Sequence, residues 1–183
     1  MSRLTIHRDD APAIPLSTTG EANVIAEQLA EIGVAFERWA ATAPLPREAD
    51  DAAVLAAYAG DIDRLKRRGG YQAVDVIRMT PDNPAAGELR AKFLAEHTHA
   101  DDEVRFFVEG AAQFYLHGGG KVFMLVCEAG DLISIPAGTR HWFDMGPKPH
   151  FTALRLFISP AGWVADFTGA DIAKGFPKYE LAA

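Results

Sequence analysis

The sequence predicts one mainly β domain with helices in its N-terminal region, an α+β arrangement. A length of 183 residues suits a single domain with its own core. From residue 71 onward, short apolar runs alternate with glycine-containing turns, which is typical of a β-barrel or sandwich. Before residue 70, apolar residues recur at helical spacing. We therefore expect residues 1–70 to form a mixed helical region packed on a barrel of residues 71–168, with 169–183 as a C-terminal tail.

The N-terminal region combines helical periodicity with two short strands. Val24, Ile25, Leu29 and Ile32 recur on one helical face, and Gly33 is a plausible helix end. A second helical stretch is rich in alanine, and glycines 69–70 close it after a basic last turn that suits the helix dipole. The expected elements are a strand at 3–7, a helix at 20–33, a strand at 34–39 and helices at 50–59 and 61–68.

The remaining chain contains short β-rich runs. The dividers between them are Gly-, Pro- or Asp-containing turns, including Gly110 and the triplet 118–120. No Lys-Ser/Thr pair follows the triplet, so a hairpin turn is favoured over a phosphate-binding loop. The expected strands cover 71–79, 104–109, 112–116, 121–128, 132–135, 142–145 and 152–159.

Composition limits the class of function. A formal net charge of −7 disfavours nucleic acid or an anionic membrane surface as the main partner. No apolar run reaches the roughly 18 residues of a membrane span, and the N-terminus does not resemble a secretory signal. Cys127 is the only cysteine, which excludes an internal disulfide and fits a cytoplasmic location. Its apolar surroundings predict a buried core residue.

Three histidines and a glutamate have the spacing of one mononuclear metal site. His97 and His99 are two residues apart, so on a strand both side chains point to one face, while His141 arrives from a later strand. On a straight strand Glu103 would lie about 13 Å from His99. The chain must therefore fold back around residues 100–102, where two aspartates favour a turn.

Imidazole and carboxylate ligands together suit Fe, Ni, Mn or Zn. Four protein ligands around an octahedral ion leave two vertices free for a bidentate substrate. The other histidines, His7, His117 and His150, lack such a pattern, and we expect them to be structural or exposed.

These residues resemble the two motifs of the cupin superfamily. His97, His99, Glu103 and Gly110 fit the first motif, although its leading glycine is replaced by Ala91. Gly130, Pro136, Gly138 and His141 fit the second motif, in which Met145 replaces an asparagine. The resemblance implies a jelly-roll-like cupin β-barrel.

Two longer segments, residues 96–110 and 158–169, are similar to the signatures of bacterial acireductone dioxygenases, and the resemblance covers nearly the whole chain. It implies a methionine-salvage enzyme that cleaves 1,2-dihydroxy-3-keto-5-methylthiopentene with O₂. One Fe(2+) or Ni(2+) per chain would be bound by His97, His99, Glu103 and His141. The Fe form would give formate and 2-keto-4-methylthiobutyrate, and the Ni form formate, CO and 3-methylthiopropionate. Family precedent also implies a monomer.

Further residues receive roles from their pattern or from the resemblance. Arg105 shares the strand parity of Glu103, so it can point into the same cavity, and the resemblance makes it the catalytic cation that holds the substrate dianion. Arg155 lies between apolar residues and is a candidate support for the site. The resemblance suggests that Glu96 assists metal incorporation and that Asp102 relays conformational change. Phe93, Phe143 and Trp163 are candidates for an apolar wall around the methylthio tail, although each also suits the core.

Three alternatives remain open on the sequence, and one of them is a purely structural barrel without a metal. Cupin motifs occur in enzymes of many activities, so another metal-dependent cupin, such as a decarboxylase or a different dioxygenase, has the same ligand pattern. A non-catalytic metal- or ligand-binding cupin is the second alternative. Arg105 argues against that one, because a storage site has little use for a cation beside the open vertices.

Overall fold

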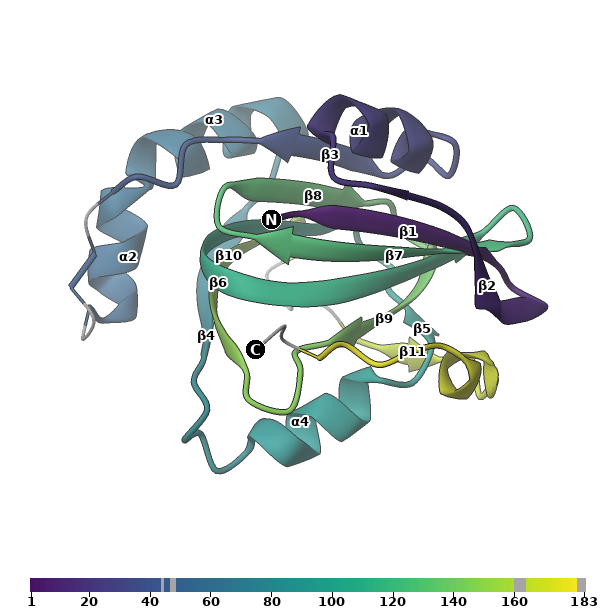
Figure 1. Cartoon of the computed structure of the whole chain (residues 1–183). Helices are drawn as coiled ribbons and strands as arrows, with labels where there is room; N and C mark the ends of the chain where they lie inside the picture. Colours follow the sequence, from purple (N-terminus) through teal and green to yellow (C-terminus); the bar gives the residue numbers. More distant parts are fainter. Residues whose placement is uncertain (44, 47–48, 160–163, 181–183) are drawn as a thin grey trace.

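The longest strand, β6 (Glu103–Gly118), joins two antiparallel layers. The structure is a computed structural model that describes residues 1–43, 45–46, 49–159 and 164–180. The first half of β6 pairs with β8 (Asp131–Ile135) and β10 (His150–Phe157). Its second half pairs with β7 (Lys121–Glu128) and β9 (Arg140–Asp144). One strand therefore fixes the position of both layers (Figure 1).

Each layer is extended by outer strands. In the first layer, β10 pairs with β4 (Ala73–Met79) and β8 pairs with β3 (Ala35–Arg38). In the second layer the strands run, in order, as β2 (Ala11–Thr19), β1 (Arg3–Arg8), β7, β6, β9, β5 (His97–Thr98) and β11 (Asp166–Phe167) (Figure 1).

The mainly β fold with N-terminal helices is confirmed, with one refinement. Within the described residues, β2, β11, β3 and β4 each have a hydrogen-bonded neighbour on one side only. The strands therefore wrap around the core as an open, cupin-like sheet, and hydrogen bonds do not close it into a complete barrel.

Gly110 bends β6 instead of ending it. Residues 104–109 and 112–116 were expected as separate strands, but they form one strand that passes from one layer to the other. Gly110 has a φ of +66°, and a Cβ atom built on it would lie 1.8 Å from the carbonyl oxygen of His150. The pairing with β10 shifts register beside it, between Thr152 and Ala153. Gly110 was expected in a turn between two strands. In the structure it forms a bulge-like bend where two backbones approach closely.

Aromatic side chains fill the space between the layers. The ring centre of Phe114 lies 4.8 Å from that of Phe143, which is 5.7 Å from that of Phe151, and all three residues are buried. Cys127 lies in the same core and is fully buried, as expected. Burial of such large rings supplies much of the favourable free energy of folding.

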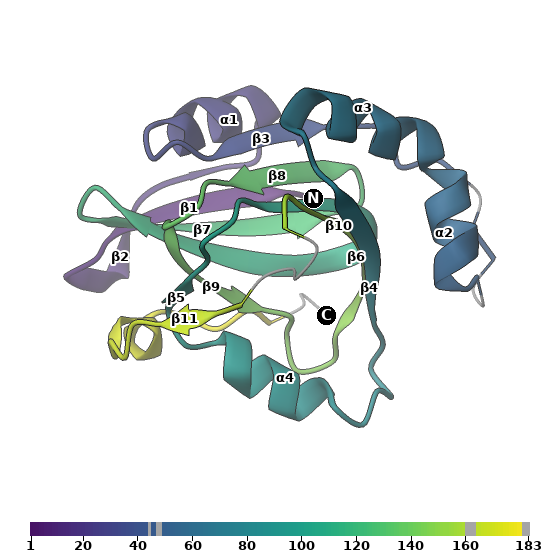
Figure 2. The same cartoon turned by 180° about the vertical axis from the view of Figure 1, so that it is seen from behind.

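Helices cover the outside of the strands (Figures 1 and 2). Helices α2 (Asp51–Ala57) and α3 (Ala59–Gly69) pack Val54 and Leu65 against the first layer. Helix α1 (Ala22–Ala30) lies near β3, and α4 (Ala86–Phe93) lies on the opposite side, against β9. The short 3-10 helix η1 (Ile172–Gly175) lies in the C-terminal segment.

Strand β2 and helix α4 were not expected from the sequence. Pro12 and Pro15 argue against a central strand, and β2 is indeed an edge strand, where proline is tolerated. Helix α4 contains Gly87 and is held in place by a tertiary ion pair between Arg90 and Asp144. Neither feature gives a clear periodic signal in the sequence.

We expect Gly110→Ala to lower the free energy of unfolding by about 3 kcal/mol or more, because the new methyl group meets backbone that cannot move aside. Urea denaturation of the purified variants measures the change. Gly119→Ala is the matched control, since Gly119 also has a positive φ, +59°, but faces open space. It should cost about 1 kcal/mol. Equal losses in the two variants would rule out the close approach as the cause.

Candidate metal centre

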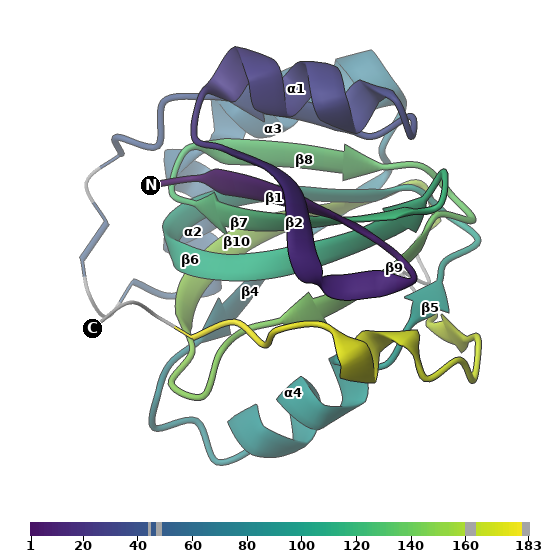
Figure 3. The same ribbon diagram turned by 45° about the vertical axis from the view of Figure 1, so that its right-hand side comes forward.

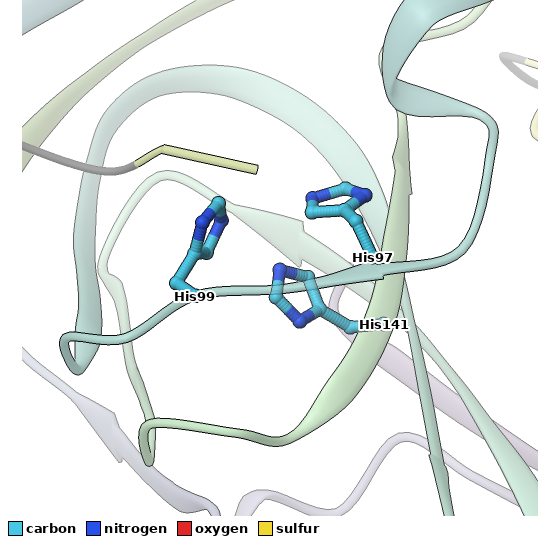
Figure 4. A group of neighbouring side chains, drawn as sticks. All are labelled: His97, His99 and His141. Atoms are coloured by element: carbon cyan, nitrogen blue, oxygen red, sulfur yellow. The ribbon is translucent and has the colours of Figure 1, made fainter. Parts of the chain in front are cut away.

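Three histidines converge at one end of the space between the layers. His97 on β5 is the register partner of His141 on β9, and His99 follows β5 directly. One nitrogen from each ring lies within 4.8 Å of the others, and all three residues are buried. Figure 4 shows the three rings turned toward a common point. This separation is suited to three ligands of one ion.

Glu103 joins the histidines because the chain folds back before β6, as the sequence required. Its Oε2 lies 3.0 Å from Nε2 of His141 and 3.2 Å from Nε2 of His99. Two aspartates stabilise the bend: Asp101 accepts from the amide of Ser159, and Asp102 accepts from the amide of Ala137. Asp102 therefore acts in the turn between His99 and Glu103 and is not among the residues that line the cavity.

The ring orientation of each histidine is fixed by a backbone carbonyl. Nδ1 of His97, His99 and His141 lies 2.8, 3.0 and 2.8 Å from the carbonyl oxygens of Ala95, Val164 and Thr139, respectively. If each Nδ1–H donates to its carbonyl, the neutral ring presents the lone pair of Nε2 to the cavity. Carbonyl partners commonly orient metal-binding histidines in this way.

The donor set fits a metal ion. Lone pairs on Nε2 and on the Glu103 carboxylate face each other at 3.0–3.2 Å, an arrangement that favours a cation or a proton between them. Three nitrogen donors and one carboxylate suit a transition metal. Metal binding is therefore supported by the geometry of these side chains.

Electrostatics favour the binding form of Glu103 and His97, whereas for His99 the effect of Glu103 outweighs burial and raises the pKa. Burial alone would raise the pKa of Glu103, but the Arg105 charge, followed by the contacts with His141 and His99, holds that pKa well below its usual value. Burial, together with the neighbouring His141, lowers the pKa of His97 to about 4. At neutral pH Glu103 is thus ionised and His97 is neutral.

Arg105 occupies the cavity beside Glu103, as its strand parity predicted. Its Nε lies 2.7 Å from Oε1 of Glu103, and its guanidinium carbon lies 4.4 Å from the ring centre of Phe143 and 5.1 Å from that of Phe114. Ion pairing and contact with aromatic faces offset the cost of burying this charge. The guanidinium is a fixed cation next to the candidate ligands.

The centre opens into a cavity of about 210 Å³. Phe93, Phe143 and Arg155, all proposed from the sequence, line it, whereas Trp163 lies outside the described residues. Of the other lining residues, Met145 stands at the asparagine position of the second cupin motif. The rest carry no signal in the sequence, and most of them lie on β4 and α4, whose packing brings them to the cavity. The other lining residues are Ile77, Met79, Leu89, Lys92, Met145 and Ala165.

Arg155 is held by an acidic neighbour on the next strand. Its Nε and Nη2 lie 2.8 and 2.6 Å from the two carboxylate oxygens of Asp75 on β4. On the other side, Arg155 is the register partner of Arg105. This two-point pair fixes the guanidinium at the cavity wall.

Glu96 points away from the cavity into a separate buried cluster. One carboxylate oxygen lies 2.6 Å from Nδ1 of His117, and the other accepts from the hydroxyl of Thr168 at 2.8 Å. Nε2 of His117 is 3.3 Å from Asp9. His7 is buried against Phe176, and His150 is exposed, so none of the three remaining histidines lines the cavity.

Comparisons with known proteins by sequence and by structure all match the same family. The profile of the ARD/ARD' family matches residues 3–165. An acireductone dioxygenase of Parvibaculum lavamentivorans is 58% identical over 98% of both chains. One from Pseudomonas aeruginosa is 56% identical over 98% of this chain and 99% of the relative. The solved acireductone dioxygenase of Bacillus anthracis, with a cadmium ion in its active centre, has a TM-score of 0.80 and 32% identity, covering 91% of this chain and 98% of that one.

Among the described residues, no helix has the length and apolar character needed to cross a membrane.

Replacing His117 by Ala should lower the free energy of unfolding by about 1–3 kcal/mol, because it removes a buried partner of the Glu96 carboxylate. Urea denaturation measures this loss. His150→Ala is the control, since His150 is exposed and 3.6 Å from Glu109, and should change stability by less than about 0.5 kcal/mol. If both variants are equally stable, the contact with Glu96 contributes little.

Proposed function

The chain belongs to the ARD/ARD' family of acireductone dioxygenases, and on that basis we propose that it cleaves 1,2-dihydroxy-3-keto-5-methylthiopentene with O₂ in methionine salvage. The enzyme class, a dioxygenase, follows from membership of the family. One observation carries the assignment of the site: four candidate metal ligands and a buried cation meet at the end of one cavity.

We assign one Fe(2+) or Ni(2+) ion per chain to His97, His99, Glu103 and His141. The converging Nε2 atoms and the ionised carboxylate support this ligand set. When bound, such an ion would supply Lewis acidity toward the oxygens of the substrate. The protein holds the donors in place: three backbone carbonyls orient the histidine rings, and Arg105 pairs with Glu103.

Arg105 is the proposed catalytic cation. An enediol loses protons readily, and the resulting anion needs a fixed positive charge nearby. The guanidinium remains charged and lines the cavity, while its Nε is paired with Glu103. Arg105 would therefore stabilise the deprotonated substrate and orient its oxygens.

The apolar part of the cavity suits the methylthio tail. Phe93 and Phe143 line it together with Met79 and Met145, and such a wall also limits the access of water to reactive species. Arg155, fixed by Asp75, would support this wall from β10. The position of Trp163 stays a prediction.

For two carboxylates near the ligands, family resemblance suggests supporting roles: Glu96 in metal incorporation and Asp102 in relaying conformational change. Glu96 precedes His97 and is tied to His117 and Thr168, which connects the ligand strand to neighbouring segments. Asp102 holds the turn before Glu103, so movement at residue 137 would be transmitted to that ligand. We further propose a cytoplasmic monomer with only small-molecule partners.

Metal analysis paired with product identification tests this function. Purified protein should contain about one transition-metal ion per chain and consume acireductone only when O₂ is present. The Fe-loaded protein should yield formate and 2-keto-4-methylthiobutyrate, and the Ni-loaded protein formate, CO and 3-methylthiopropionate. A metal-loaded protein that leaves acireductone unchanged would exclude the proposal in favour of another cupin activity.

Arg105→Met should lower kcat/KM by about a hundredfold or more, because it removes the charge that stabilises the anionic substrate. His97→Ala and His141→Ala should instead lose bound metal, as measured by elemental analysis. Arg67→Met, at an exposed position on α3, controls for the loss of one positive charge. Metal loss in Arg105→Met would show that this arginine chiefly holds Glu103 in place.

A further inference from the structure

A lysine stands at the rim of the cavity. Lys92 lies in the last turn of α4, is exposed, and lines the cavity. Its Nζ is 5.5 Å from the ring centre of Phe93, and that ring centre is 6.1 Å from the ring centre of His97. One aromatic ring therefore separates the ammonium group from a candidate ligand. Helix α4 keeps this position because it packs on β9, the strand that carries His141 (Figures 2 and 3).

Lys92 is the more available of the two cations in this helical turn. Arg90, two residues earlier, is committed to Asp144 through bonds of 2.6 and 3.0 Å. In the part of the chain that the structure describes, no carboxylate lies within 4.0 Å of Nζ of Lys92. Among the described residues, Lys92 therefore has no ion pair that would give it a purely structural role.

The charged residues that line the cavity have an excess of positive charge. Among the lining residues described, Lys92, Arg105 and Arg155 are cations and Glu103 is the only carboxylate. Arg105 is paired with Glu103 and Arg155 with Asp75, so the excess charge is that of Lys92. The chain as a whole carries a formal net charge of −7. A cavity with charge opposite to that of the surrounding surface concentrates ligands of the matching sign.

We propose that Lys92 binds anionic ligands at the cavity mouth and favours enediolates and carboxylates over neutral ligands. The inference rests on the proposed function, in which the substrate binds as an anion. Lys92 stands at the rim, whereas Arg105 is buried beside the ligands. The charge of Lys92 should therefore affect how fast and how tightly the anionic substrate binds, and it should leave the rate of reaction of the bound substrate unchanged.

Lys92→Met tests the proposal, with Lys92→Arg retaining the charge and Lys148→Met removing an exposed lysine of the β9–β10 turn. We expect Lys92→Met to raise KM for acireductone by about three- to tenfold at low salt with little change in kcat. Wild-type kcat/KM should fall as NaCl increases, and this salt dependence should be weaker in Lys92→Met. Lys92→Arg and Lys148→Met should behave like the wild type.

A binding measurement separates this inference from the proposed function. Squarate, a stable planar dianion with adjacent oxygens, can be titrated calorimetrically into the metal-loaded proteins without turnover. Its Kd should increase about three- to tenfold in Lys92→Met alone. An unchanged Kd and an unchanged salt dependence would overturn the role of Lys92, even if acireductone is consumed. A wild-type protein that does not consume acireductone would overturn the function, while the squarate result would still decide whether Lys92 captures anions.

Discussion

The buried carboxylate of Glu103 is the constraint around which this centre is built. Removing a carboxylate from water costs several kcal/mol unless hydrogen bonds and opposite charge replace its hydration. Here Arg105 lies 2.7 Å from one oxygen, and Nε2 atoms of His99 and His141 lie 3.2 and 3.0 Å from the other. Arg105 lies on β6 with Glu103, and His99 is four residues before it, so His141 on β9 is the distant partner. The carboxylate therefore gains its full set of partners only when β9 is placed beside β6.

Two features of the backbone bring these segments together: the bend in β6 and the register of β9. Strand β6 carries both Glu103 and Arg105 at its first residues, and its bend at Gly110 allows the same strand to form the second layer beside β9. The register of β9 then places His141 opposite His97. A change of one residue in that register would turn the His141 side chain to the other face of the sheet.

The sequence predicted those parts of the fold that depend on local pattern. The strand at 121–128 was correct at both ends because an apolar run lies between Gly120 and the Ala129-Gly130 turn. The His-x-His spacing and the parity of Arg105 likewise required only strand geometry. By contrast, β2 and α4 are stabilised by tertiary contacts that no local window contains, such as the pairing of β2 with β1 and the bond from Arg90 to Asp144. Cavity residues on β4 and α4, including Met79 and Leu89, could not be identified for the same reason.

The charges at the centre also restrict which ligand it can favour. Glu103 and Arg105 form a pair of zero net charge, and the lowered pKa of His97 keeps that ring neutral near pH 7. A divalent ion on these donors would leave two positive charges at the closed end of the cavity. Lys92 at the rim would add a third, whereas Asp75 balances the charge of Arg155. Because the aromatic surroundings screen charge less than water does, a dianion that supplies two oxygens would be favoured over a neutral molecule of the same shape. A deprotonated acireductone has this charge and this pair of oxygens, so the electrostatics and the ligand geometry favour the same substrate class.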